Sequence, residues 1–316
     1  MIDNSQLRTV LGDVDIESLE ADGGMALIHE HLSCDLSAGF GPEYVLRDPG
    51  MLADELAAAK LAGVSLVVDV GNTGHLREPV FLRNLADKSG VHVVASAGHY
   101  REGFFPEGLD VMSAEAIAAG IVQEIEVGIG DTGIRAGAIG EVGMTEGRAT
   151  PLEEKVFAAS AQAQARTGVA LMTHTAQGVG WEQQVQMLRD GGADLGRVII
   201  GHMDCLDDNS AHVGVVESGA WLGFDRINSL RYQTDEVRAE RLVQLLDAGL
   251  GHRVVLSTDT AMVTRLQAGG GAGYSAVISQ FLPMLRSLGV SDAWIHTLSV
   301  TNNWRFLAGS RSGGGV

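Results

Sequence analysis

The stretch MALIHEH, residues 25–31, ends an apolar run with two histidines that are separated by one residue. In a β-strand, residues i and i+2 point to the same face, so His29 and His31 would project together while Glu30 turns outward toward the surrounding layer. If that face points into the interior of a barrel, both imidazoles can bind one divalent metal ion. Two ordinary hydrogen-bonded histidines fit this motif as well, so the rest of the chain has to be considered.

Seven further short apolar runs alternate with segments of helical periodicity, a pattern typical of parallel βα units. The eight expected strands cover residues 25–28, 65–70, 91–97, 136–142, 169–173, 197–201, 221–225 and 253–258. Helices are expected between them, for example over residues 51–62, 114–127, 152–166, 235–248 and 275–288. Prolines stand where helices should begin and glycines where they should end, as at Pro49, Pro79, Pro151, Gly63, Gly90, Gly168, Gly249 and Gly289.

Eight strands that alternate with helices predict an α/β fold, the (β/α)8 TIM barrel, with its active site at the C-terminal ends of the strands. No linker rich in proline, serine or charge divides the chain, so a single domain is expected. Residues 1–24 would form an N-terminal extension that covers part of the barrel. Residues 25–309 would form the barrel, and the Gly-rich residues 310–316 a disordered tail.

The composition excludes some classes of partner and indicates the cellular compartment. The 316 residues are 45% hydrophobic, and 40 acidic against 22 basic residues give a formal charge of −18. Nucleic acid or an anionic membrane would be repelled, and no apolar stretch approaches the ~20 residues that span a bilayer. Two cysteines, Cys34 and Cys205, are too few for a disulfide framework, and residues 1–20 lack a secretory signal, so a cytoplasmic protein is expected.

Metal-binding side chains recur at the ends of the expected strands, on one face of the barrel. They are His29 and His31 after the first strand, Glu141 near the end of the fourth, His174 after the fifth, His202 after the sixth and Asp259 after the eighth. Any one of them could simply cap a strand, but six unpaired imidazoles and carboxylates at one focus would be costly. Two more histidines at strand ends, His75 and His99, are expected in the pocket wall.

Six ligands exceed the three protein ligands of a catalytic zinc and suit two metals. One ion would take His29, His31 and Asp259, and the other would take His174 and His202. Glu141 would bridge them together with a hydroxide. Two ions about 3.5–4 Å apart polarise a carbonyl or phosphoryl oxygen and lower the pKa of a bridging water toward ~7. The pattern therefore predicts a hydrolase.

Four motifs together resemble the phosphotriesterase family of the amidohydrolase superfamily: Ile28-His29-Glu30-His31-Leu32, Thr173-His174-Thr175, Ile200-Gly201-His202 and Ser257-Thr258-Asp259. The similarity runs from about residue 23 to 307. Further landmarks in family order are Thr150-Pro151-Leu152-Glu153-Glu154 and Thr301-Asn302-Asn303. The resemblance implies a (β/α)8 hydrolase with two divalent metal ions and a homodimeric state. We expect zinc, with manganese or cobalt as alternatives.

The chain departs from the founding phosphotriesterases, which bridge their metals with a carboxylated lysine at the end of strand 4. Its lysines, Lys60, Lys88 and Lys155, all fall in expected helices. Ile139-Gly140-Glu141-Val142-Gly143 instead resembles the branch of phosphotriesterase homology proteins, in which a glutamate takes the bridging role. This departure weakens the case for organophosphate substrates.

Two positions bear on the substrate by resemblance to family lactonases. Tyr100 follows strand 3 where those enzymes carry a tyrosine beside the metals, and Asp225-Arg226 after strand 7 resembles their Asp-Arg pair. A hydroxyl and a guanidinium suit a carbonyl oxygen or an acidic group, although Arg226 could instead pair with a surface acid. The glycine-rich loop 260–274, with Arg265, could close over substrate or be flexible surface.

The expected function is therefore a binuclear metal hydrolase that acts on a small-molecule carboxylic ester, with a lactone as the leading candidate. The bridging hydroxide would attack the carbonyl carbon, and Asp259 would carry the proton to the leaving group, with Tyr100 and Arg226 on the substrate. One alternative is phosphotriesterase or phosphodiesterase activity at the same metals. Others are a mononuclear deaminase, which would not need Glu141, and a non-catalytic binding protein.

Overall fold

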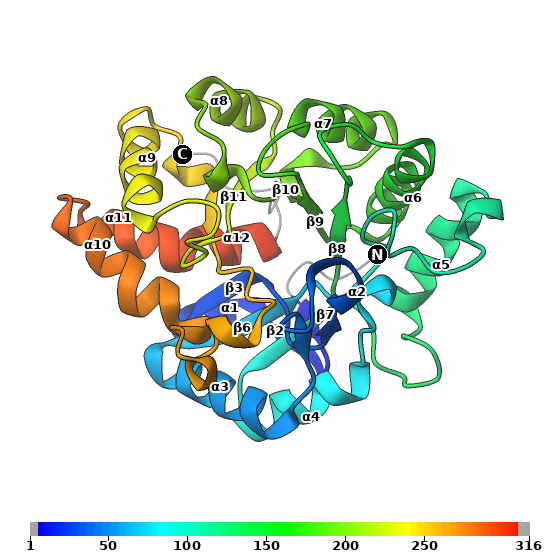
Figure 1. The fold of residues 1–316 in the computed structure, drawn as a ribbon, viewed down its shortest axis with the longest axis horizontal. Helices are drawn as coiled ribbons and strands as arrows, with labels where there is room; N and C mark the ends of the chain where they lie inside the picture. The colour runs from blue at the N-terminus through cyan, green and yellow to red at the C-terminus, as the bar shows by residue number, and fades with distance from the viewer. Residues whose placement is uncertain (1–5, 309–316) are drawn as a thin grey trace.

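The computed structural model describes residues 6–308, and these form a barrel of eight parallel strands ringed by helices (Figure 1). In chain order the strands are β3 (Met25–Glu30), β6 (Val64–Asp69), β7 (His92–Ala97), β8 (Ala138–Gly143), β9 (Ala170–His174), β10 (Val198–Ile200), β11 (Trp221–Phe224) and β12 (Val254–Leu256). Each strand lies beside its predecessor in this order. All eight expected strands are thus confirmed, and with them the barrel.

Helices follow the strands and cover the outside of the barrel. The longer ones are α3 (Pro49–Ala62), α4 (Pro79–Ser89), α5 (Ala114–Glu126), α6 (Pro151–Thr167), α7 (Trp181–Asp190), α8 (Asn209–Glu217) and α9 (Asp235–Asp247). The three prolines open α3, α4 and α6 as expected, because the first helical position needs no N–H partner. Left-handed Gly63, Gly90 and Gly168 end the same helices.

The prediction of a single helix over residues 275–288 is wrong in one respect. The segment is helical, but a π-helix (Val277–Phe281) precedes a short α10 (Leu282–Ser287). Pro283 is the physical reason, because its ring excludes an N–H bond to the preceding turn and crowds the carbonyl there. The chain then continues through α11 (Asp292–His296), a second π-helix (Thr297–Thr301) and α12 (Asn302–Ala308).

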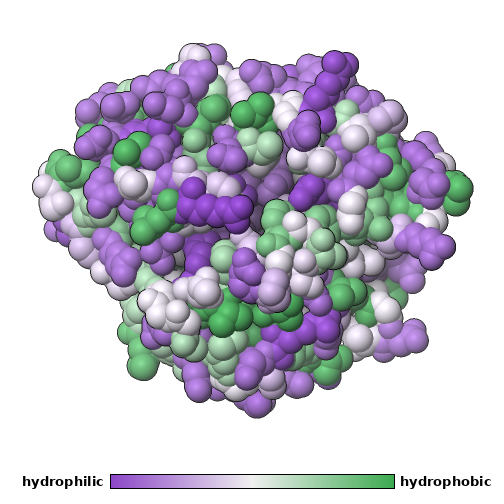
Figure 2. Space-filling view, in the orientation of Figure 1, coloured by the Kyte–Doolittle hydropathy of each residue, from purple (hydrophilic) through white to green (hydrophobic). Residues whose placement is uncertain are grey.

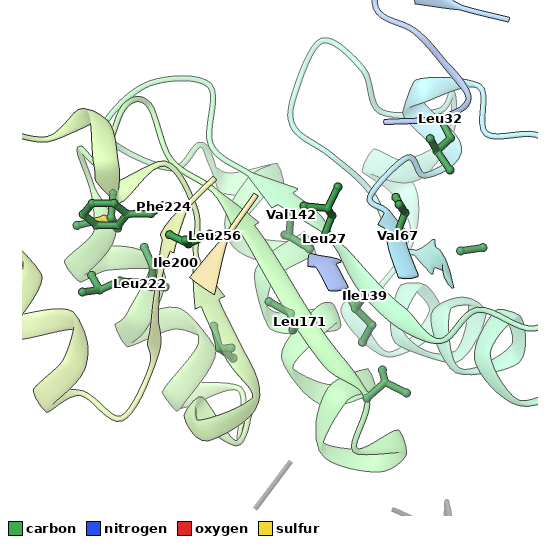
Figure 3. Packing of buried hydrophobic residues seen from close by; sticks show 14 of the residues in the cluster. Leu27, Leu32, Val67, Ile139, Val142, Leu171, Ile200, Leu222, Phe224 and Leu256 are labelled. Atoms are coloured by element: carbon green, nitrogen blue, oxygen red, sulfur yellow. The ribbon is translucent and has the colours of Figure 1, made fainter. Parts of the chain in front are cut away.

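Alternate residues of each strand serve two different cores. Leu27, Val67 and Leu171 point outward, and Figure 3 shows this cluster between the strands and their helices. Their neighbours Ile28 and Met172 belong to a second cluster, which fills the barrel interior. Both sets are buried, as period-two alternation in a closed sheet requires.

The N-terminal end of the barrel is covered by a hairpin of β1 (Gln6–Thr9) and β2 (Gly12–Asp15) followed by α1 (Ile16–Ala21). Leu7, Ile16 and Leu19 pack into the interior cluster, and the Val10 N–H donates to the Val93 carbonyl (2.9 Å). This segment corresponds to the expected extension over residues 1–24, and the expected tail over 310–316 lies outside the described residues. Within residues 6–308 no helix has both the length and the apolar character to cross a membrane.

Side chains close the barrel at the seam between β3 and β12. Asn303 donates through Nδ2 to the carbonyls of Ala26 and Leu256, one on each strand. The His29 N–H donates to Ser257 Oγ (3.0 Å), and the Asp259 N–H donates to the His29 carbonyl (3.0 Å). The two strands that carry three expected metal ligands are therefore held in register without a continuous backbone ladder.

Candidate metal centre

The six side chains expected to bind metal converge at the C-terminal end of the barrel. They come from β3, β8 and β9 and from the turns after β10 and β12. Four of them are at most 2% exposed, and the other two, His174 and Asp259, are partly buried at the floor of a cavity of about 540 Å³. Figure 2 shows the molecule hollowed near its centre, with hydrophilic side chains on the rim of the hollow.

Glu141 lies between two groups of histidines. Its Oε2 is 3.2 Å from His29 Nε2 and 2.9 Å from His174 Nδ1, and its Oε1 is 3.6 Å from His31 Nε2. Ligand atoms of His29, His31 and Glu141 lie within 4.8 Å of one another, as do those of Glu141, His174 and His202. The carboxylate belongs to both groups, which is the position that a bridging ligand would occupy.

Asp259 adds a second carboxylate to one of these groups. Its Oδ1 lies 3.2 Å from His31 Nε2 and 3.8 Å from His29 Nε2. The other group is completed by His202, whose Nε2 is 2.8 Å from His174 Nδ1. His29, His31 and Asp259 therefore form one group with Glu141, and His174 and His202 form the other.

Asp225 orients one histidine of each group, a role that the sequence analysis missed. Its Oδ2 lies 2.9 Å from His29 Nδ1, and its Oδ1 lies 2.8 Å from His202 Nδ1 and accepts from the His202 N–H (2.9 Å). The signal was a carboxylate at the end of an expected strand, which had been noted only as half of an Asp-Arg pair. A carboxylate behind an imidazole is a common companion of metal-binding histidine.

Buried polar atoms without a hydrogen bond test whether metal ions fit. Both ring nitrogens of His29 and Nδ1 of His31 are buried and have no hydrogen bond among the described residues. His29 Nε2 lies 3.2 Å from Glu141 Oε2, and His202 Nε2 lies 3.9 Å from the same oxygen. Divalent cations between these nitrogens and the carboxylate would accept their lone pairs, so the residues fit two ions.

Without cations, the ionisation of the cluster responds to burial and to neighbouring charge. Burial lowers the pKa of His174 to about 4, with His202 adding to the effect, so its ring is neutral at pH 7. Burial alone would raise the pKa of Glu141, but His174 and His29 hold it well below its usual range. A neutral imidazole and an ionised carboxylate are the forms that ligate metals.

Neither additional strand-end histidine lines the cavity, contrary to expectation. His75 is fully buried behind the cluster, where its Nδ1 accepts from the Asn72 N–H (3.2 Å) and its Nε2 lies 3.8 Å from Glu141 Oε1. His99 instead lines a separate cavity of about 230 Å³ beside α5. Burial lowers the pKa of both, to about 3 for His75 and about 4 for His99.

Glu30 is fully buried at the seam between β3 and β12. Its carboxylate accepts from Ser257 Oγ (2.8 Å), from the hydroxyl and N–H of Thr258 and from the N–H of Thr260 (3.0 Å). From the other side, Arg265 donates to the carbonyls of Thr258 and Asp259. The two side chains thus fix the turn in which Asp259 adopts a left-handed backbone (φ +47°).

The loop over residues 260–274 is anchored over the metal-binding end of the barrel. Tyr274 donates through its hydroxyl to the His31 carbonyl (2.7 Å), and the Ala268 N–H donates to Glu55 (2.8 Å). Gly270 and Gly271, from the middle of the loop, line the cavity. The loop therefore forms one wall of the site.

Tyr100 and Arg226 both line the cavity beside the cluster. The Tyr100 hydroxyl lies 3.2 Å from His174 Nε2, and burial raises its pKa well above the usual value, so it stays a protonated donor. Arg226 Nε donates to Asp259 Oδ2 (3.1 Å), and its guanidinium lies 4.1 Å from the centre of the Tyr232 ring. The acid that pairs with Arg226 is thus a predicted metal ligand rather than a surface group.

Comparisons with known proteins agree with this geometry. The model of the Phosphotriesterase family matches residues 5–307. The phosphotriesterase homology protein of Escherichia coli (strain K12) is 37% identical over 285 residues, which cover 90% of this chain and 97% of that protein. An N-acetyltaurine hydrolase of Dictyostelium discoideum is 32% identical over 265 residues, which cover 80% of this chain and 71% of that protein.

A solved structure extends the likeness to three dimensions. The crystal structure of the E. coli phosphotriesterase homology protein, complexed with phosphate in the active site, matches with a TM-score of 0.88 and covers 90% of this chain and 99% of that chain. The span that the family model matches, residues 5–307, contains the whole barrel and all six expected ligands. The chain therefore belongs to the phosphotriesterase family, and it is a metal-dependent hydrolase.

Proposed function

We propose that the chain is a binuclear metal hydrolase of carboxylic esters, with lactones as the leading substrate class. The observation that carries the proposal is the shared position of Glu141, which lies within reach of both groups of histidines. His29, His31 and Asp259 would hold one ion, His174 and His202 the other, and Glu141 both. Nitrogen and carboxylate donors suit zinc, with manganese or cobalt as alternatives.

When bound, such ions polarise a carbonyl oxygen and lower the pKa of water. The chain's own side chains would do the remaining work. Asp259 borders the cavity and is placed to take the proton that water loses when it adds to the carbonyl carbon, and to pass it to the leaving oxygen. Arg226 would keep Asp259 ionised and aimed at this proton. The protonated hydroxyl of Tyr100 would donate to the carbonyl oxygen.

Phosphoesters and amides are the two alternative types of bond that the same centre could hydrolyse. The phosphate in the active site of the E. coli relative's structure favours a phosphoester. The name of the Dictyostelium relative, N-acetyltaurine hydrolase, favours an amide of an N-acyl compound. A mononuclear deaminase is a weaker candidate, because a single metal ion would not need a carboxylate that belongs to both groups of ligands.

A matched substrate panel tests the proposal. We expect zinc- or manganese-loaded protein to hydrolyse lactones of five and six ring atoms with kcat/KM at least about tenfold above that for aryl phosphodiesters, aryl phosphotriesters and N-acetyl amides. A planar carbonyl carbon presents less steric demand than a tetrahedral phosphorus, and an ester has a better leaving group than an amide. Steady-state proton release gives one readout for every ester, and the appearance of free amine gives the rate for the amides, whose hydrolysis releases no net proton near pH 7. Turnover confined to phosphoesters or to amides would overturn the assignment.

A further inference from the structure

Two arginines at the cavity, Arg101 and Arg231, have no carboxylate within ion-pair distance among residues 6–308. They differ in this from Arg226, which is bound to Asp259. The acidic residues that line the cavity in the described part of the chain are Glu141 and Asp259, and both belong to the candidate metal centre. The outer part of the cavity therefore presents cations that no protein anion neutralises.

Arg101 is held by three aromatic rings. Its guanidinium carbon lies 5.4, 5.2 and 5.1 Å from the ring centres of Phe40, Tyr100 and Phe104, and the rings of Phe40 and Phe104 stack at 5.8 Å. Contacts of this kind attract the cation to the ring faces and leave its N–H groups for a further partner. The side chain is ordered before any ligand binds, which reduces the entropy that binding would cost.

Arg231 is positioned by two tyrosines at the same cavity. Its Nη1 donates to the Tyr44 hydroxyl (3.0 Å), and its guanidinium carbon lies 5.7 Å from the Tyr232 ring centre. The Tyr232 ring also stacks against Arg226, so the two arginines share one aromatic support. Unlike Arg101, Arg231 is exposed, which places it at the entrance.

Apolar and aromatic side chains line the same cavity, and the rings of Phe40 and Tyr44, which contact Arg101 and Arg231 respectively, lie 5.2 Å apart. Leu36, Phe40, Tyr44, Ala261 and Met262 line it together with the arginines. A ligand that fills the cavity would therefore meet polar chemistry at two places and apolar side chains as well. One place is the cluster around Glu141, and the other is the pair of guanidinium groups.

We propose that the natural substrate carries an oxyanion group, such as a carboxylate, in addition to the group that is hydrolysed, and that Arg101 and Arg231 bind this oxyanion. The inference rests on the proposed function for the cleaved bond, but the anion site is defined by the arginines alone. A guanidinium fork matches the two oxygens of a carboxylate, sulfonate or phosphate. In a chain of net charge −18, such local cations are needed to admit an anionic ligand.

The test compares γ-butyrolactone with its ring carboxylate, 5-oxotetrahydrofuran-2-carboxylate, in the metal-loaded protein. We expect the carboxylate to have the higher kcat/KM. Arg101→Gln and Arg231→Gln should each lower the ratio of the two kcat/KM values by about 10- to 100-fold, mainly through the KM of the carboxylate, as expected for loss of a charge-assisted hydrogen bond. Arg101→Lys should lower it less. Arg83→Gln, at an exposed position on α4 outside the cavity, is the matched control.

Equilibrium binding separates this inference from the proposed function. Cyclopentanone and 3-oxocyclopentane-1-carboxylate resemble the two lactones but cannot be hydrolysed, and calorimetry gives their affinities. Arginine-dependent binding of the carboxylate supports the anion site even if no lactone is cleaved, which would overturn only the proposed bond type. Two results would overturn the anion site while leaving lactone hydrolysis intact. One is the same ratio of kcat/KM values in the wild type and in both Gln variants. The other is an affinity for the carboxylate that neither variant changes.

Discussion

Replacement of Glu141 by alanine should lower turnover on the identified substrate by about a thousandfold or more, equivalent to roughly 4 kcal/mol of transition-state stabilisation. The carboxylate belongs to both groups of candidate ligands, so its loss removes a shared ligand and the negative charge that would keep two cations close. The measurement is kcat/KM of the metal-loaded variant beside that of the wild type.

The fold should survive this change, because the backbone of Glu141 is held independently of its side chain. Its N–H donates to the Val70 carbonyl (2.9 Å), and its carbonyl accepts from Asn72 Nδ2 (3.0 Å). Glu141→Gln keeps the size of the side chain but loses its charge, and we expect nearly the same loss of turnover. Near-normal turnover by Glu141→Ala with two ions retained would contradict the bridging role.

Asp259→Asn should lower kcat by about 100- to 10,000-fold, the usual contribution of a positioned acid or base. The amide is isosteric but cannot take a proton at neutral pH. At pH 7 the wild-type group is ionised, because His31 and His202 hold its pKa below the usual range despite burial, which acts in the opposite direction. Because this pKa lies below pH 5, we expect the rate of the variant to be lower by a similar factor at every pH from 5 to 9. An unchanged kcat would exclude Asp259 from proton transfer.

Arg226→Ala provides a graded comparison for that experiment. It removes the Nε–H bond to Asp259 Oδ2 but leaves the carboxylate in place, so we expect a smaller loss of about 10- to 100-fold. A loss as large as that of Asp259→Asn would mean that the guanidinium itself contacts the reacting atoms. The metal content of both variants has to be measured, since Asp259 is also a proposed ligand.

The sequence predicted the barrel because its signals are local. Each strand is a short apolar run, and helices begin at prolines and end at glycines that constrain only neighbouring residues. The six candidate ligands followed from the same reasoning, since residues at the C-terminal ends of parallel strands meet. The π-helix before α10 was not predicted, because the helical periodicity of this segment indicates a helix without showing where its hydrogen bonding changes.

The features that escaped prediction depend on contacts between distant residues. Glu30 bonds to Ser257 Oγ across 227 positions, and Arg226 bonds to Asp259 across 33. Asp225 acquires its role only once β3 and β10 bring His29 and His202 to either side of it. No local pattern marks such a carboxylate, so the residues that orient the candidate ligands required the structure.

The most direct test of the central claim is the metal content of the wild-type protein. The account predicts about two divalent ions per chain by elemental analysis after loading with zinc or manganese. Loading should not depend on bicarbonate, because a glutamate, unlike a lysine, needs no carbon dioxide to bridge two cations. A content of one ion or none in fully loaded protein would contradict the binuclear centre.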